Sequence, residues 1–365
     1  FTQGLAHNNE QGINVWDADT IYPVNGICKG SDGSLYTALV EQSGNNPVGD
    51  LLGNWVSSIS INDLSLPYVF DTVAAMQNSS IAFPVGKTIE TNYHNLVSND
   101  GGAKYIVRAG SSPEPVGSPN LNGDFYAELQ GKSDWMSPEV FGSDGTAAVD
   151  SVVIPVYMKE VRKQLWKSGK TYVLDADVSG SSRAFEVFSD TEMSGYGAIV
   201  DMRGASNNGF YIGFNNGYLF RNQIRGFRFT QSNVSSITNA IMIEGFVNYM
   251  IIEDCTCIGM DQYFIGMGGD NSGYNYLTVR NNVATNINPQ VDNQYSLCYE
   301  FFPKQSSLGM KFYGNYGEQV GWGGVFKIHT CTDSYIFDNT FIRTSNVGNS
   351  QSQAVMLGGR ITHPT

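Results

Sequence analysis

The sequence predicts a mainly β fold, in which a parallel β-helix follows small β-rich modules. Three observations lead to this prediction. Glycine is abundant, at 41 of 365 residues, whereas charged residues make up only 15%. Tyrosine and phenylalanine are also frequent, at 20 residues each. Such a composition is typical of many short strands joined by tight turns. The third observation is a repeated strand segment in the second half of the chain.

The repeat is an apolar strand segment whose copies can be aligned at their last residue. The four copies end at Cys255, Asn282, Asn315 and Asn339, with spacings of 27, 33 and 24 residues. A second apolar strand precedes the copies, at 240–244, 263–267, 296–301, 324–328 and 354–357. A unit that cannot bury its own apolar face must stack on its neighbours. Asparagine tolerates the left-handed bend of a corner, and its amide can bond to the copies above and below. We therefore expect a structural asparagine ladder inside a parallel β-helix.

Residues 1–60 are predicted to form a small β module. A strand at 34–40 lies between two turn-forming runs, and the aromatic residues are Trp16, Tyr22, Tyr36 and Trp55. The turn, the strand and the closing Asn54-Trp55-Val56 resemble small chitin-binding-like modules of phage tail proteins. The aromatic rings fit two interpretations, a platform that stacks on sugar rings or the core of the module itself.

Residues 61–135 and 136–365 are predicted to be a connector and the β-helix. A short helix near 70–76, a strand at 85–91 and a strand at 99–107 resemble the connector before the β-helix of many bacteriophage tailspikes. The run Glu139–Thr146, a helix near 152–166 and a strand at 169–174 resemble the opening of pectate-lyase-like domains. This resemblance implies a right-handed coil, a helix that caps its open end, and a homotrimer. The last unit breaks off at 354–365, so we expect further rungs beyond it.

Charge and cysteine content narrow the possible partners. The net charge of −13 argues against binding to duplex nucleic acid, which needs a concentrated positive field. No run approaches the roughly 18 apolar residues of a membrane span. The five cysteines include no Cys-x-x-Cys pair, and the four histidines lack metal-ligand spacing. We expect reduced cysteines, no metal and no cofactor.

Acidic residues on the outer face of the coil are the candidates for catalysis. Glycosidic hydrolysis normally needs two carboxylates, and neighbouring rungs about 4.8 Å apart can supply them. Glu300 is predicted to act with Asp270 or Glu244 as general acid and base, with Glu244 and Glu300 at matching strand positions two rungs apart. The predicted substrate-binding residues are Tyr299 and Trp322, by stacking, and Lys327, His329, Lys304 and Arg280, by charge.

Elimination from a uronate is an open alternative. This reaction needs cations that neutralise the carboxylate of the uronate, and a base that removes a proton. Arg280, Lys327, Tyr313 and His329 are its candidates. Together with the resemblance, these residues predict a phage tailspike in the virion tail that depolymerises capsule or O-antigen. A spike of the same fold that binds without cleaving is the non-catalytic alternative. The N-terminal region is expected to dock to other tail or baseplate proteins.

Overall fold

The structure is a computed structural model of the chain. It describes residues 15–32, 34–50, 52–60, 67–95, 100–175, 185–203, 208–213, 218–232, 239–260, 263–268, 272–287, 297–319, 325–329, 331–343 and 355–358. The chain divides into two compact units, residues 1–68 with 81–88 and residues 69–80 with 89–365. In the described part, no helix is long and apolar enough to cross a membrane. The predicted three-part division at 60 and 135 stays a prediction.

The first unit contains an antiparallel sheet of β1 (Ile27–Lys29), β2 (Ser34–Ala38) and β3 (Trp55–Ser60). Tyr22 and Trp55 are both 7% exposed and meet edge to face at 5.2 Å, and Trp16 and Tyr36 pack against this core. The indole N–H of Trp55 donates to a backbone carbonyl. The aromatic residues therefore build the core of the module, which removes Tyr22 and Trp55 from a sugar-stacking platform.

A four-stranded sheet in the order β4-β5-β6-β7 precedes the β-helix. Its strands and its helix are β4 (Tyr68–Thr72), α2 (Val73–Gln77), β5 (Thr88–Asn95), β6 (Asp100–Ala109) and β7 (Phe125–Leu129). Helix α2 begins one residue later than an Asp71 cap implies, because the hydroxyl of Thr72 accepts the N–H of Ala75 at 3.0 Å. The predicted helix and strands of this segment are present.

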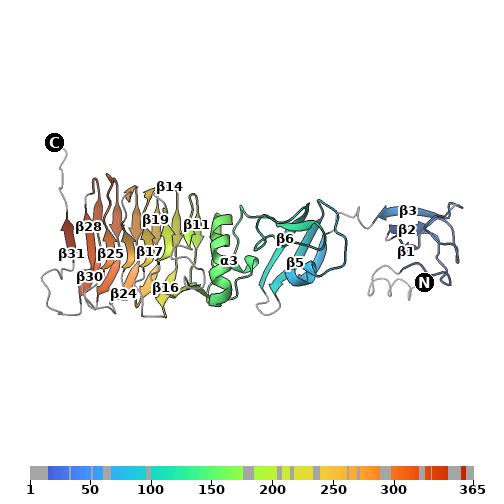
Figure 1. Ribbon diagram of the computed structural model, residues 1–365, viewed down its shortest axis with the longest axis horizontal. Coiled ribbons are helices and arrows are strands. Elements are labelled where there is room, and N and C mark those ends of the chain that lie inside the picture. The colour runs from blue at the N-terminus through green and yellow to red at the C-terminus, as the bar shows by residue number, and fades with distance from the viewer. Residues whose placement is uncertain are drawn as a thin grey trace. The chain divides into compact units, whose positions relative to one another are not determined.

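The helix α3 (Ala147–Glu160) packs against β9 (Thr171–Asp175) at the start of the coil (Figure 1). It follows η1 (Pro138–Phe141) and begins five residues earlier than the 152–166 predicted from the sequence. Buried Asp150 ties its first turn to the coil by accepting the hydroxyl of Ser143 at 2.7 Å and the N–H of Val173 at 2.9 Å. Burial raises the pKa of Asp150. The expected capping helix is thus present, with a different start.

A network of buried and half-buried charges joins the connector sheet to the coil. Glu139 of η1 is 1% exposed and accepts the phenolic hydroxyl of Tyr172 at 2.8 Å. The Lys170 ammonium lies 3.2 Å from Glu139 and 3.0 Å from Asp100 of β6, and Lys167 also pairs with Asp100. These contacts join β6, η1 and the turn that leads into β9, which are separated in the sequence. Removing Lys170 would leave the buried Glu139 carboxylate without its ammonium partner.

The remaining strands form a parallel β-helix with three wide faces, which confirms the predicted architecture (Figure 1). Face 1 contains β10 (Glu186–Val187), β13 (Asn208–Ile212), β17 (Asn239–Ile243), β21 (Tyr263–Met267), β25 (Leu297–Phe301), β28 (Phe326–His329) and β31 (Val355–Gly358). Face 2 contains β8 (Lys163–Leu165), β11 (Glu192–Ser194), β15 (Gln223–Arg225), β19 (Ile251–Glu253), β23 (Thr278–Arg280), β26 (Lys311–Tyr313) and β29 (Tyr335–Phe337).

Face 3 and a shorter face complete each rung. Face 3 contains β9, β12 (Ile199–Arg203), β16 (Arg228–Gln231), β20 (Thr256–Ile258), β24 (Val283–Ile287), β27 (Tyr316–Gln319) and β30 (Thr340–Arg343). The narrow face, between faces 1 and 2 in chain order, contains β14 (Tyr218–Phe220), β18 (Phe246–Asn248) and β22 (Gly273–Asn275). Short strands that alternate buried and outward residues fill the interior from every side.

The asparagine ladder lies at the corner between faces 2 and 3, as the repeat predicts. The side-chain oxygen of Asn282 accepts the N–H of Cys255 at 3.0 Å, that of Asn315 accepts the N–H of Asn282 at 3.1 Å, and that of Asn339 accepts the N–H of Asn315 at 3.0 Å. Asp254 beside it has a positive φ of 57°, so its assignment to a turn is confirmed.

Aromatic side chains fill the interior of the coil. Trp166 meets Phe210 and Phe227 at 5.6 and 5.4 Å, and Phe312 meets Phe326 at 4.6 Å further along. All five cysteines are free, and four are buried, which confirms the expectation of reduced thiols. Burial raises the pKa of Cys255 to about 12, so this thiol is a packing residue rather than a nucleophile.

Candidate functional site

The candidate site lies on face 1, where β25 and β28 run side by side. Tyr299 and Phe301 of β25 are fully buried, whereas Glu300 between them points outward. The register pairs Glu300 with Gly266 on one neighbouring rung and with Lys327 on the other. Alternation along the strand therefore places a carboxylate and an ammonium side by side on the outer surface.

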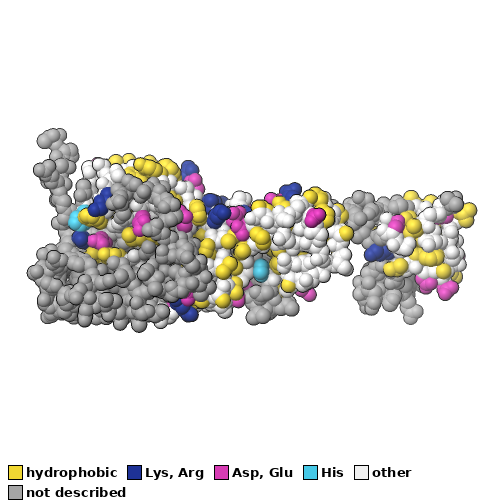
Figure 2. All heavy atoms as spheres, viewed as in Figure 1, with side chains coloured by type: hydrophobic (Ala, Val, Ile, Leu, Met, Phe, Trp, Pro, Cys, Tyr) yellow, Lys and Arg dark blue, Asp and Glu magenta, His cyan; other side chains and the backbone are white. Residues whose placement is uncertain are grey.

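Five side chains gather here, and we call them the Glu300–His329 cluster: Glu300, Phe302, Lys304, Lys327 and His329. The Lys327 ammonium lies 3.1 Å from a Glu300 carboxylate oxygen. The ring of Phe302 lies 4.0 Å from the Lys304 ammonium and 4.4 Å from the His329 ring, which it meets edge to face. On this side of the coil, near β28, Figure 2 shows histidine, basic and acidic side chains together. The cluster thus combines a carboxylate, two cations, an imidazole and an aromatic ring.

The segment Phe302–Leu308 holds part of this cluster in place. The Phe302 N–H donates to the carbonyl of Met267 at 3.2 Å, and the Lys304 N–H donates to the carbonyl of Ser272 at 2.8 Å. The Ser272 hydroxyl in turn donates to the Phe302 carbonyl at 3.2 Å. The backbone under Phe302 and Lys304 is therefore bonded to the neighbouring rung, which fixes where their side chains begin.

The surroundings of His329 favour its neutral form. Burial lowers its pKa below the ordinary 6.5, the charges of Lys327 and Lys304 lower it further, and Glu300 opposes them. Within the described residues, no hydrogen-bond partner is found for its buried Nε2 atom. A neutral imidazole is able to accept a proton at neutral pH, which is the property that a general base needs.

The register does not support the predicted pairing of Glu244 with Glu300. Met242 opposes Gly266, which opposes Glu300, so the residue at the matching position is Met242. Glu244 lies two residues further along, at the level of Phe302. An offset of two rungs and two residues separates Glu244 from Glu300 by roughly 12 Å along the sheet. This distance exceeds the carboxylate separation needed for either retaining or inverting hydrolysis. The prediction that Glu244 and Glu300 occupy matching strand positions was wrong, because it aligned the two strands by their last residues. Asp270 lies outside the described residues, so its pairing with Glu300 stays a prediction.

Two of the predicted substrate-binding residues lie away from the cluster. Tyr299 is fully buried, and its hydroxyl donates to the carbonyls of Asn282 and Tyr316 at 3.2 and 3.0 Å. Its ring is part of the core, so the prediction that it stacks on a sugar is wrong. Arg280 belongs to face 2, where it pairs with Glu253 and donates to the Tyr313 hydroxyl at 3.0 Å. Trp322 lies outside the described residues.

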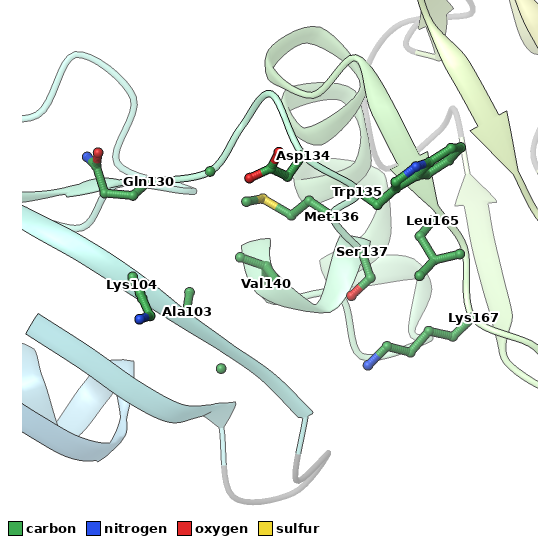
Figure 3. Close-up of a pocket in the computed structure, with 12 residues that line it drawn as sticks. Ala103, Lys104, Gln130, Asp134, Trp135, Met136, Ser137, Val140, Leu165 and Lys167 are labelled. Atoms are coloured by element: carbon green, nitrogen blue, oxygen red, sulfur yellow. The ribbon is translucent and has the colours of Figure 1, made fainter.

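A concavity near the cap was not anticipated from the sequence (Figure 3). Its volume is about 410 Å³, and it lies between β6 and the segment leading into η1. Trp135, Met136 and Leu165 supply apolar walls, and Lys104, Gln130, Asp134 and Lys167 supply polar groups. Lys167 and Lys104 are paired with Asp100 and Glu90. Because these segments are separated in the sequence, no local pattern indicated the concavity. No three acidic, histidine or cysteine side chains converge on a metal position within the described ranges.

Comparison with known proteins gives matches among solved structures alone. No protein-family model matches the chain, and no curated protein matches its sequence. The tailspike protein of Acinetobacter baumannii phage AM24 is similar over 77% of this chain and 64% of that chain, with 12% identity and a TM-score of 0.40. The enzymatically active domain of tailspike protein 4 of bacteriophage CBA120 is similar over 97% and 65%, with 11% identity and a TM-score of 0.34.

A bacterial protein is among the same matches. WceF of Pantoea stewartii, described as a glycan biofilm modifying enzyme with a tailspike-like parallel β-helix fold, is similar over 88% of this chain and 55% of that chain. The identity is 10% and the TM-score 0.43. The chain thus spans less than two thirds of each of these three proteins. At these identities and TM-scores, neither fold nor activity is carried over from these proteins to this chain.

Proposed function

We propose that this chain is part of a phage tail spike that binds and cleaves bacterial surface polysaccharide, capsule or O-antigen, on face 1 of its β-helix. The observation that carries the proposal is the Glu300–His329 cluster, a set of reactive and sugar-binding groups on the outer surface of a rigid coil. Solenoids provide long surfaces of fixed geometry, and such surfaces suit extended ligands. Phe302 supplies a ring for stacking, and Lys304 supplies a cation for acidic sugars.

Hydrolysis is the first candidate reaction. Glu300 would protonate the leaving oxygen or activate a water molecule, with Asp270 in the complementary role. The Lys327 ammonium lies 3.1 Å from a Glu300 carboxylate oxygen and would orient this carboxylate toward the substrate.

Elimination is the second candidate, and the position of His329 favours it. Lys304 and Lys327 would neutralise the carboxylate of a uronate, which makes the proton on the adjacent carbon more acidic. The neutral His329 would accept that proton, the C–O bond on the next carbon would break as a C=C bond forms, and the leaving oxygen would take a proton from water. The lysines and the imidazole needed for this reaction lie in one cluster, whereas the other two candidates, Arg280 and Tyr313, are paired with each other on face 2.

The proposal is tested with capsule and O-antigen preparations from a panel of host strains. Reducing ends and ultraviolet absorbance from unsaturated uronates are followed together. Reducing ends without absorbance indicate hydrolysis, and both signals indicate elimination. A glycan that binds but gives neither signal would support the non-catalytic spike and contradict the proposed cleavage.

The pH dependence gives a separate expectation for elimination. Because the pKa of His329 lies below 6.5, the neutral base is already present at pH 7 and is lost only as the pH falls through the lowered value. The rate should therefore be flat above pH 7 and should fall in more acidic solution. In the His329→Gln variant, the residual rate should no longer fall as the solution becomes more acidic. An unchanged acidic limb in this variant would assign it to another group.

The assembly of the spike is also a proposal. We infer that three copies form a homotrimer and that residues 1–135 dock to other tail or baseplate proteins, which places the protein in the virion tail. Sedimentation equilibrium of the purified chain measures the first point directly. A mass of three chains is expected, and a monomer at all concentrations would contradict it.

A further inference from the structure

An Asn-Tyr pair occurs on two consecutive rungs of the narrow face, and the sequence gives it no role in the core. Asn248 is the last residue of β18 and Tyr249 follows it, and in the same way Asn275 is the last residue of β22 and Tyr276 follows it. The two tyrosine rings stack, with centroids 4.9 Å apart and an interplanar angle of 13°. Tyr249 is 58% exposed and Tyr276 is 48% exposed. Two large rings are therefore held in one geometry at the surface.

The backbone at both tyrosines is strained. Tyr249 and Tyr276 have φ values of 55° and 58°, in the left-handed region that bulky residues rarely adopt. Gly309 and Asp333 occupy the same corner on later rungs, with φ values of 74° and 47°. Glycine and aspartate fit this corner better, so the fold itself does not require tyrosine. Strain of this kind, where it is retained, suggests a function for the side chain.

A second aromatic pair lies beside the first on the narrow face. The rings of Tyr218 and Phe246 are 5.5 Å apart, and Tyr218 is 68% exposed. On the next rung the register places Gly273, where an added Cβ would lie 2.7 Å from the Phe246 ring. Similarly, a Cβ on Gly309 would lie 2.9 Å from the Tyr276 ring. Each aromatic pair therefore ends with a ring packed against the backbone of a glycine, where any larger residue would collide with that ring.

Two amides lie between these aromatic pairs. The Asn275 amide donates to the side-chain oxygen of Asn248 at 3.0 Å, and the register aligns the two residues. We call the set Tyr218, Phe246, Asn248, Tyr249, Asn275 and Tyr276 the Asn-Tyr face. Figure 2 shows hydrophobic side chains gathered along the edge of the coil where Figure 1 labels β14. The nearby charged corner residue, Arg221, is paired with Asp190 at 2.6 Å.

The segment Phe302–Leu308 connects the Asn-Tyr face to the Glu300–His329 cluster. Phe302 and Lys304, at its start, belong to the cluster. Gln305 follows, and its Cβ lies 3.0 Å from the position of a Cβ on Gly273, beside the Phe246 ring. Leu308, at its end, bridges to Asn275 of the Asn-Tyr face. A single extended ligand that crosses the cluster would thus continue onto this face.

We propose that the Asn-Tyr face is a set of distal subsites that hold an uncharged stretch of the same polysaccharide strand, an inference that rests on the proposed function. Aromatic rings contact the apolar faces of sugar rings, and amides bond to hydroxyl groups and fix orientation. Arg221 and Asp190 pair with each other, and the six side chains of the Asn-Tyr face itself carry no charge, so this face suits an uncharged ligand. A glycan strand fits this alternation of rings and amides better than the aliphatic surface of a second chain.

The test is the double variant Tyr249→Asn with Tyr276→Asn. Asparagine tolerates the left-handed backbone, so the corner should fold in the variant. Binding is measured with a capsular or O-antigen polysaccharide that the parent protein cleaves, and with its shortest cleavable oligosaccharide. The polysaccharide should bind about tenfold more weakly, as expected for loss of aromatic contacts, and kcat should not change. The short oligosaccharide should show no difference, because it does not reach the Asn-Tyr face.

Tyr335→Asn is the matched control, because Tyr335 is 61% exposed but lies on face 2. It should bind both ligands like the parent protein. Equal polysaccharide affinity of the parent and the double variant would overturn the inference and leave the proposed function intact. A lower mass in sedimentation with unchanged affinity would instead assign the Asn-Tyr face to contacts between copies, which also overturns it. A parent protein that binds no glycan of the panel overturns both the inference and the proposed function.

Discussion

Replacing Glu300 by glutamine should reduce polysaccharide cleavage by about 10²- to 10⁴-fold, the usual contribution of a general acid or base. The change is nearly isosteric and removes the charge that faces Lys327 at 3.1 Å. The side chain is 15% exposed, so the neutral amide should fit without repacking. Because Phe302 and Lys304 remain, glycan affinity should stay within a few fold. The measurements are reducing-end release at saturating substrate and binding of the intact glycan.

The control for this variant is Glu318→Gln. Glu318 is an outward carboxylate on β27, in face 3, and it accepts the hydroxyl of Tyr316 at 3.4 Å. The Glu318→Gln variant should cleave the polysaccharide at the same rate as the parent protein. If Glu300→Gln retains most of the activity while His329→Gln loses it, Glu300 only positions Lys327 and the reaction is elimination. Full activity of both variants would contradict a role for the cluster in cleavage.

Replacing Asn315 by alanine should lower the free energy of unfolding of the coil by about 3–5 kcal/mol, because several buried groups would lose their partners. Asn315 is 1% exposed. Its amide donates to the carbonyls of Val279 and Tyr313 at 3.0 and 3.1 Å, and its oxygen accepts two bonds from Asn282. The empty space left by the side chain adds to the loss. Urea unfolding followed by circular dichroism measures the shift.

The matched control for the ladder is Asn120→Ala. Asn120 is exposed, and its oxygen accepts one N–H, that of Ser112, at 2.7 Å. Loss of this single hydrogen bond should lower the free energy of unfolding by only about 0.5–1.5 kcal/mol. The double variant of Asn282 and Asn315 should lose less than the sum of the single variants, because they share bonds within one ladder. Equal effects of Asn315→Ala and Asn120→Ala would contradict a structural role for the ladder.

The sequence was sufficient to predict the coil because its signal is repeated. The spacing of Cys255, Asn282, Asn315 and Asn339 reflects a buried ladder that constrains every rung, and the structure shows that ladder directly. The position of Asp254 in a turn followed from the same alignment. The start of α3 was less predictable, because the polar first turn around Asp150 is buried by tertiary bonds that no local pattern reveals.

The candidate site was predictable only in part. Tyr299 and Glu300 are neighbours in one strand, so they point to opposite sides, and assigning both to the surface could not be right. Arg280 was assigned to the same site because the sequence did not separate faces 1 and 2. Glu244 was misplaced because the ends of strands do not fix their register. Lys327 and His329 lie on β28 next to Glu300 on β25, and Lys304 follows β25 by three residues, so the structure brings these four residues together, while their roles stay predictions.

The most direct test of the central claim is a crystal structure of Glu300→Gln with a bound oligosaccharide from a glycan that the parent protein cleaves. The proposal predicts a sugar ring against Phe302, with the glycosidic linkage beside position 300 and within reach of Lys304, Lys327 or His329. An oligosaccharide bound instead on face 2, beside Arg280 and Tyr313, with no density on face 1, would contradict the assignment of the site to the Glu300–His329 cluster.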